Sequence, residues 1–224
     1  LARKSLLLFG HATFITLLLL AWQHAELRTT SGDSGFQVFK WIAYPDWNVE
    51  AHRYAAILPQ AAVKLFKLFG ASLSTLLLVA SLAHVMVAYG VFICCAHFIR
   101  APISALATAL ATVLCTRLTF YGPVLEANYV LSLPFLFFAV VEHQDVGPIS
   151  ARAGIDLLLA AALTLFVHPL GWAVLAFGTA FFWSEGRLSI KQAAWMIGGL
   201  FCWGLLSRLL FPPTAYEAAQ YAKL

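Results

Sequence analysis

The sequence predicts an all-α protein: a polytopic transmembrane helical bundle of about seven spans, with interfacial helices in a long first external loop. Two observations predict this class. Seven long apolar stretches follow one another in 224 residues, and 62% of the residues are hydrophobic while only 11% are charged. A water-soluble domain does not bury so much apolar surface in one core. Residues 1–224 are therefore expected to form a single transmembrane domain.

The first apolar stretch runs from about Ser5 to Trp22 and follows the basic pair Arg3 and Lys4. It is long enough to cross a hydrocarbon layer of about 30 Å. No small-residue cleavage site follows it and more apolar stretches come later, so we interpret it as a span rather than a signal peptide. The remaining spans are predicted over 71–98, 102–119, 128–142, 153–167, 170–184 and 193–211.

Lysine and arginine in short loops mark the cytoplasmic side of a membrane protein. The N-terminus and the loops after the second, fourth and sixth spans fall on one side of the predicted bundle. Their cations are Arg3, Lys4, Arg100, Arg152, Arg187 and Lys191. The first loop on the opposite side carries cations of its own, so the assignment depends on the later, shorter loops. We expect a multi-pass protein with a cytoplasmic N-terminus.

The first loop, about 23–70, is the only long polar segment and the first place to look for chemistry. Its stretch 30–35 is rich in turn residues and leaves the carboxylate of Asp33 close to the membrane surface. The stretch 36–47 is expected in the headgroup layer because of its aromatic residues. They are Phe36, Phe39, Trp41, Tyr44 and Trp47. The stretch 58–69 is amphipathic and predicts a helix in the membrane plane, or alternatively an extension of the second span.

Other polar residues converge on the same external face. The candidates besides Asp33 are His52, Arg53, Arg117, Tyr121, Glu126, Asn128, His168 and Arg208. A charge inside the hydrocarbon layer costs about 2.5–3.5 kcal/mol, so Arg117, Glu126 and Arg208 either reach the headgroups or line a wet cavity. Both interpretations stay open, with Arg117 as a partner for Glu126. His168, before a proline in a turn, is either simply solvated or a phosphate ligand.

Several function classes lack their signatures in this sequence. There is no Walker loop, no dinucleotide-binding glycine pattern and no paired Cys-x-x-Cys, which argues against nucleotide hydrolysis and structural zinc. The net charge of +4 comes from loop cations suited to anionic lipid, and nucleic acid is not an expected partner. His84 and His97 in the second span are interpreted as packing groups, because the mid-span positions are otherwise almost all apolar.

With these features in this order, the sequence resembles the type C glycosyltransferases, membrane enzymes of the GT-C fold that use polyprenyl-phosphate-linked sugars. Asp33 takes the position of that family's catalytic first-loop Asp. The stretch 36–69 resembles its interfacial helices, and 121–128 resembles its second external loop. The resemblance covers nearly the whole chain. Its first-loop motif often has two adjacent acids, whereas Ser34 follows Asp33 here, so metal binding stays open.

The resemblance implies a membrane glycosyltransferase that moves a hexosyl or pentosyl group from a polyprenyl-phosphate donor to an acceptor at the extracytoplasmic face. Asp33 would be the catalytic base. Arg53, His52, Arg117, His168 and Arg208 would bind the donor phosphate, and Glu126, Tyr121 and Asn128 would assist substrate or metal. Membrane lipid and the lipid-linked donor are the expected partners, with a divalent metal left open as a cofactor.

Enzymes of this family continue past the seventh span, so we expect the chain ending at Leu224 to be part of a longer protein. A second hypothesis comes from another class of protein. The chain would then be a non-enzymatic multispanning transporter or membrane scaffold subunit whose charged rim only anchors it in the bilayer.

Overall fold

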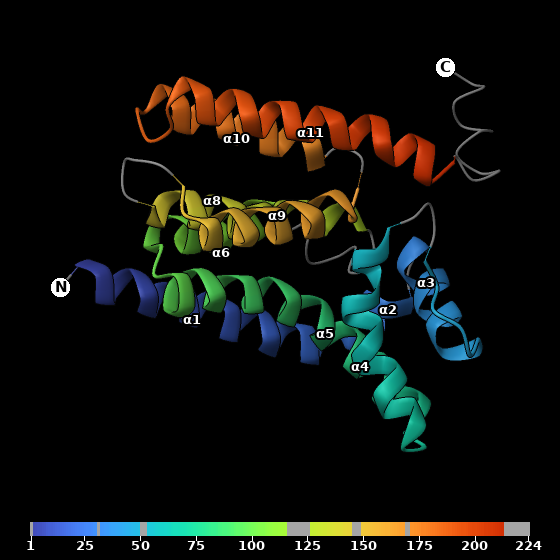
Figure 1. Cartoon of the computed structure of the whole chain (residues 1–224). Coiled ribbons are helices and arrows are strands. Elements are labelled where there is room, and N and C mark those ends of the chain that lie inside the picture. The colour runs from blue at the N-terminus through green and yellow to red at the C-terminus, as the bar shows by residue number, and fades with distance from the viewer. Residues whose placement is uncertain are drawn as a thin grey trace.

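The computed structural model describes residues 2–30, 32–49, 53–115, 126–144, 149–168 and 171–212. Helices make up its regular structure and no strand occurs within those ranges, so the predicted all-α class is confirmed. Figure 1 shows the long helices lying side by side along one direction, with the shorter helices of the first loop gathered at one end.

Each of the predicted spans holds a helix of the bundle. They are α1 (Ala2–Gln23), α5 (Leu73–Ile93), α6 (Pro102–Leu114), α8 (Pro134–His143), α9 (Ala151–Leu165), α10 (Gly171–Ser184) and α11 (Ile190–Leu210). A π-helix, η2 (Cys94–Ile99), continues α5, and a 3₁₀ helix, η3 (Glu126–Leu131), precedes α8. α1 packs on α5 and α6, α8 packs on α6 and α9, and α10 pairs with α11. Figure 1 shows these groups as successive layers.

Local sequence signals set the starts of these helices. The side chains of Ser72, Ser150 and Ser189 each accept a hydrogen bond from a backbone N–H in the first turn of α5, α9 and α11. Such caps satisfy donors that the helix itself leaves open. Pro102 and Pro134 begin α6 and α8, where the missing N–H of proline removes no helical bond.

Two helices are long and apolar enough to cross a membrane, Lys4–Gln23 and Leu73–Ile99. Three further apolar helices are shorter, at Pro102–Leu114, Tyr129–His143 and Gly171–Ser184. A buried core helix and a signal sequence meet the same criteria of length and composition, so two such helices give only coarse support for a membrane protein.

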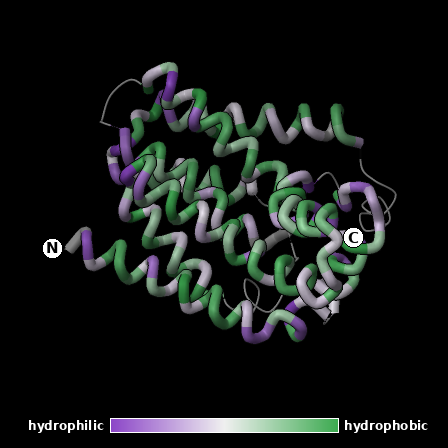
Figure 2. Tube along the Cα trace, turned by 90° about the horizontal axis from the view of Figure 1, so that it is seen from below, coloured by the Kyte–Doolittle hydropathy of each residue, from purple (hydrophilic) through white to green (hydrophobic). Residues whose placement is uncertain are grey.

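Large apolar side chains are exposed along much of the bundle. Leu8 of α1, Leu114 of α6, Phe177 of α10, and Trp195 and Leu209 of α11 are examples. Figure 2 shows long hydrophobic stretches along the helices, with the hydrophilic residues mostly near their ends. Soluble monomers do not normally expose contiguous apolar surface on this scale. The outer face of the bundle is therefore suited to an apolar environment.

Helix α1 approaches α5 closely at Gly10. A Cβ atom added there would lie 2.2 Å from Cε2 of Phe92, so a larger residue would collide with this ring. Phe14 and Phe92 are buried in the same contact, and the ring of Tyr89 stacks on Phe14 with centroids 5.1 Å apart. The small residue thus lets the two helices pack at short range.

The first loop folds into α2 (Ala25–Thr30), α3 (Gly32–Ala43), η1 (Tyr54–Ala56) and α4 (Ile57–Leu68). The prediction of a turn over 30–35 was wrong, because α3 already begins at Gly32. An acid such as Asp33 in the first turn suits the positive end of the helix dipole. The amphipathic helix expected over 58–69 is present as α4. It ends before α5 begins, so the alternative of a continuous second span was wrong.

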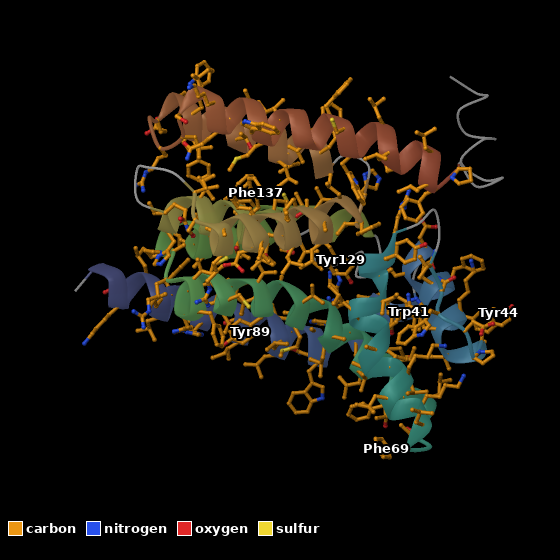
Figure 3. The ribbon with its side chains drawn as sticks, viewed as in Figure 1. Trp41, Tyr44, Phe69, Tyr89, Tyr129 and Phe137 are labelled. Atoms are coloured by element: carbon orange, nitrogen blue, oxygen red, sulfur yellow. The ribbon has the colours of Figure 1, made fainter. Side chains whose placement is uncertain are left out.

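Trp41 is a core residue of the first loop. It is 1% exposed and belongs to a small core with Val38 of α3 and Val63 of α4. Figure 3 shows it between the two helices, whereas Tyr44 and Phe69 project outward. The packing of α3 on α4 thus encloses the ring, and the location of 36–47 in the headgroup layer stays a prediction. The other aromatic side chains of 36–47 are exposed.

Candidate functional site

The first loop meets the turn after α9 at one end of the bundle. In Figure 1 the helices α2, α3 and α4 lie at the end where α9 finishes and α10 begins. The backbone N–H of Ala55 donates to the carbonyl oxygen of Phe166 at 3.3 Å. The ring of Tyr54 meets the Phe166 ring edge-on, with centroids 5.5 Å apart. These contacts join two segments that are distant in sequence.

Arg53 and His168, both predicted to bind a phosphate, come together here. Arg53 directly precedes η1, and His168 follows the end of α9. Burial lowers the pKa of His168 below its usual 6.5, and the positive charge of Arg53 lowers it further. His168 is therefore neutral at pH 7 and has a ring N–H to donate beside a guanidinium. Such a pair suits the oxygens of an anion.

Asp33 lies in the first turn of α3 and is exposed. Helix α3 is at the same end of the bundle as η1 and the end of α9 (Figure 1). Among the interactions of the described residues, no hydrogen bond or ion pair links the Asp33 carboxylate to Arg53 or His168. The predicted base and the predicted cations thus share one end of the bundle without touching.

The remaining predicted site residues cannot be placed in the same way. The backbone of 126–131 forms η3, which packs against η1 and so lies next to Arg53 in the fold. The other candidates lie outside the described residues or side chains, and their roles stay predictions. They are His52, Arg117 and Tyr121, and the side chains of Glu126, Asn128 and Arg208.

A buried arginine was missed in the sequence. Arg28 of α2 is 0% exposed, and its Nη1 donates to the carbonyl oxygen of Ser81 at 3.0 Å and also to Ser81 Oγ. Ser81 Oγ in turn donates to the carbonyl oxygen of Ala21 at 2.7 Å. The sequence shows Arg28 only as one of several loop cations, and its partner is 53 positions away. This network ties the end of α1 and α2 to α5.

A second polar pair adjoins this network. Nδ1 of His84 on α5 and the hydroxyl of Tyr129 on η3 lie 2.9 Å apart, and both side chains are buried. Burial lowers the pKa of Arg28 to about 10, while nearby Tyr129 raises it in part. Arg28 therefore remains a cation at neutral pH. His84 was interpreted as a packing group. The structure adds that its contact with Tyr129 holds η3 against α5.

Hydrogen bonds also join α4 to the end of α3 and to the segment that follows it. Nζ of Lys67 donates to the carbonyl oxygen of Ile42 at 2.5 Å, and Nζ of Lys64 donates to that of Tyr44 at 2.6 Å. Cations at these carbonyls stabilise the C-terminal end of a helix, here α3. The buried amide of Gln60 bonds to backbone atoms of Asn48 at 3.0 and 2.7 Å. These contacts hold α3 and α4 as one unit.

An apolar hollow of about 370 Å³ lies between α1 and α5. It has no charged lining residue, and Trp22 marks its position near the end of α1 that leads to α2. Its lining residues are Ile15, Leu18, Leu19, Trp22, Leu82 and Met86. Such a surface accepts a hydrocarbon chain and offers nothing to a polar ligand.

The described residues contain no group of three or more His, Cys, Asp or Glu side chains placed to hold a metal ion. No family model, curated protein sequence or solved structure matches this chain. Support for a function therefore comes from the chain's own residues, chiefly the cations Arg28 and Arg53, the neutral His168 and the exposed acid Asp33.

Proposed function

We propose that the chain is a multi-pass membrane protein that crosses the bilayer seven times with its N-terminus in the cytoplasm. The seven bundle helices run along one direction and expose large apolar side chains, which supports insertion of all of them. The later short loops at the end opposite the first loop carry Arg100, Arg152, Arg187 and Lys191. This bias supports a cytoplasmic location for that end.

We further propose that the chain belongs to a membrane glycosyltransferase that takes a sugar from a polyprenyl-phosphate donor at the extracytoplasmic face. The observation that carries the proposal is the convergence of Arg53 and His168 at the end of the bundle that also carries α3 and Asp33. Cationic and neutral donors beside an apolar bundle suit a lipid phosphate, whose tail prefers the hydrocarbon layer.

The proposed reaction is a single displacement at the anomeric carbon. The acceptor oxygen forms a bond to this carbon, while the bond from the carbon to the phosphate oxygen breaks and its electron pair goes to the phosphate. The acceptor hydroxyl gives its proton to the Asp33 carboxylate. Arg53 and His168 stabilise the charge that develops on the leaving phosphate. A divalent metal as a further aid to the leaving group stays open.

The test is transfer of labelled sugar from polyprenyl-phosphate donors by membranes that contain the full-length protein. Asp33→Asn should lower transfer at least 100-fold while leaving the amount of inserted protein unchanged, since general-base catalysis contributes about 10²–10⁴-fold. Asp156→Asn is the matched control, because Asp156 is also exposed but lies on α9. Transfer retained by Asp33→Asn would remove Asp33 from the mechanism.

The exposure of Asp33 and its separation from Arg53 and His168 favour a second candidate, a non-enzymatic transporter or scaffold subunit. In that case the cations at this end anchor the protein at the headgroups. The same assay separates the two candidates. A wild-type protein that inserts fully but transfers sugar from no hexosyl or pentosyl donor would favour the non-enzymatic role.

A further inference from the structure

A chain of three hydrogen-bonding side chains joins α1 to the end of α5, outside the proposed catalytic site. Nδ1 of His11 lies 2.9 Å from the hydroxyl of Tyr89 on α5. Nε2 of the same His11 lies 2.9 Å from Nε2 of His97 on η2. His11 therefore uses both of its ring nitrogens, one toward each partner, across 78 and 86 positions of sequence.

The two imidazoles meet end to end. Their ring centroids are 5.2 Å apart and their planes differ by 28°. When two imidazoles meet end to end, the distance between their centroids equals the distance between the two facing nitrogens plus one ring radius on each side. The observed Nε2–Nε2 distance of 2.9 Å fits this sum, so the two nitrogens point at each other along nearly one line. That is the geometry of a direct N–H···N hydrogen bond, in which one ring donates its proton and the other accepts with its lone pair.

The surrounding packing holds His11 in this position. The neighbouring Gly10 allows the close approach of α1 to Phe92, and the Phe92 ring meets the His11 ring edge-on with centroids 5.1 Å apart. Tyr89 is itself stacked on Phe14. His97, by contrast, is exposed on the π-helix, three positions before Arg100, at the end of α5 that the proposed topology places on the cytoplasmic side. Single π-helical turns of this kind are frequent at functional sites.

The number of protons on the two rings decides whether this hydrogen bond can form, so the contact is sensitive to pH. Two neutral imidazoles have one N–H and one lone pair for the shared bond, whereas a doubly protonated pair has two donors and no acceptor. Two cations at this distance also repel each other. We propose that Tyr89, His11 and His97 form a proton-sensitive latch that fastens α1 to the end of α5 while the histidine pair is neutral or shares one proton. Uptake of a further proton opens it.

The neighbouring elements supply no counter-charge to the latch among the described residues. Helix α6 contains no titratable side chain. Helix α8 brings Glu142 and His143, but the Glu142 carboxylate accepts bonds from the first turn of α6. The other titratable or charged groups on α1, α5 and η2 near this end are Lys4, Cys94, Cys95 and the following Arg100.

A direct test is nitrogen NMR of the detergent-solubilised protein with ¹⁵N-labelled histidine at pH 7.5. The latch requires a scalar coupling between Nε2 of His11 and Nε2 of His97, transmitted through the hydrogen bond. The coupling should disappear once acidification puts a proton on both nitrogens, and a series of spectra recorded downward from pH 7.5 follows this loss. A spectrum without this coupling at pH 7.5 would overturn the proposal, and this measurement needs no variant.

The second test compares thermal unfolding at pH 7.5 and 5.5. His97→Gln keeps a neutral hydrogen-bonding group near His11 but cannot take up a proton. The fall in Tm on acidification should be smaller in this variant than in the wild type by about 2–4 °C, the shift expected for one lost hydrogen bond in a chain of this size. His143→Gln, which alters another exposed histidine, should keep the wild-type fall. Parallel falls in wild type and His97→Gln would contradict the latch.

Discussion

Replacing Arg28 tests whether its buried network stabilises the junction of α1, α2 and α5. Arg28 Nη1 donates two hydrogen bonds to Ser81, and bonds from a charged donor contribute about 1.5–3 kcal/mol each. The cost of keeping a guanidinium out of water offsets part of this gain. Arg28→Ala also leaves a cavity. Together these effects predict a loss of about 2–4 kcal/mol in the free energy of unfolding.

The loss corresponds to a fall in Tm of about 5–15 °C for a chain of this length, measured by thermal unfolding in detergent. Arg28→Met keeps most of the side-chain volume, and Ser81 Oγ still donates to Ala21, so its loss should be only about 1 kcal/mol. Arg152→Ala is the control, because Arg152 is exposed on α9. A fall for Arg28→Ala no larger than that of the control would refute the reasoning.

Two further predictions concern the two ends of the bundle. Arg53→Ala should raise the pKa of His168 toward 6.5, measured by NMR titration of its ring. Because the folded-state pKa lies below the unfolded value, the unfolded chain binds more protons on acidification. The contribution of His168 to the free energy of unfolding is thus fully present above pH 6.5 and is lost as the pH decreases further. This loss should be smaller in Arg53→Ala. Glu142→Ala should cost about 0.5–2 kcal/mol in thermal unfolding, since its carboxylate caps the first turn of α6 at Ile103 and Ser104.

Controls for both predictions lie on exposed parts of the chain. Arg100→Ala should leave the His168 titration unchanged, and an equal shift in both variants would contradict a local effect of Arg53. Glu142→Gln keeps a carbonyl acceptor and should lose less stability than Glu142→Ala. Equal losses in these two Glu142 variants would show that the cap contributes little.

The helices were predictable because their signals are local. Apolar runs predicted the place of every bundle helix, and Ser72 or Pro102 at a start marks a boundary that any reader of the sequence can find. The prediction for 30–35 failed because Gly32 and Ser34 are typical of turns, while the packing of α3 on α4 decides the conformation there. Turn propensity was the weaker effect.

The candidate site was only partly predictable. The loop ends that carry Arg53 and His168 lie at the same end of the bundle, as expected for alternate ends of antiparallel helices, and the binding roles of the two residues stay predictions. Arg28 was missed because nothing local distinguishes a buried arginine from a solvated one. Its role depends on Ser81, whose position relative to α2 follows from tertiary packing alone. The histidine pair was missed for the same reason.

The lysines of α4 have a consequence for how this helix meets a bilayer. Lys64 and Lys67 each donate a hydrogen bond from the ammonium group to a carbonyl at the end of α3, which keeps these side chains close to the protein. The tip beyond them exposes Leu68 and Phe69 instead. The end of α4 should therefore attach to lipid by inserting these two apolar side chains, with the charges of Lys64 and Lys67 left near the surface.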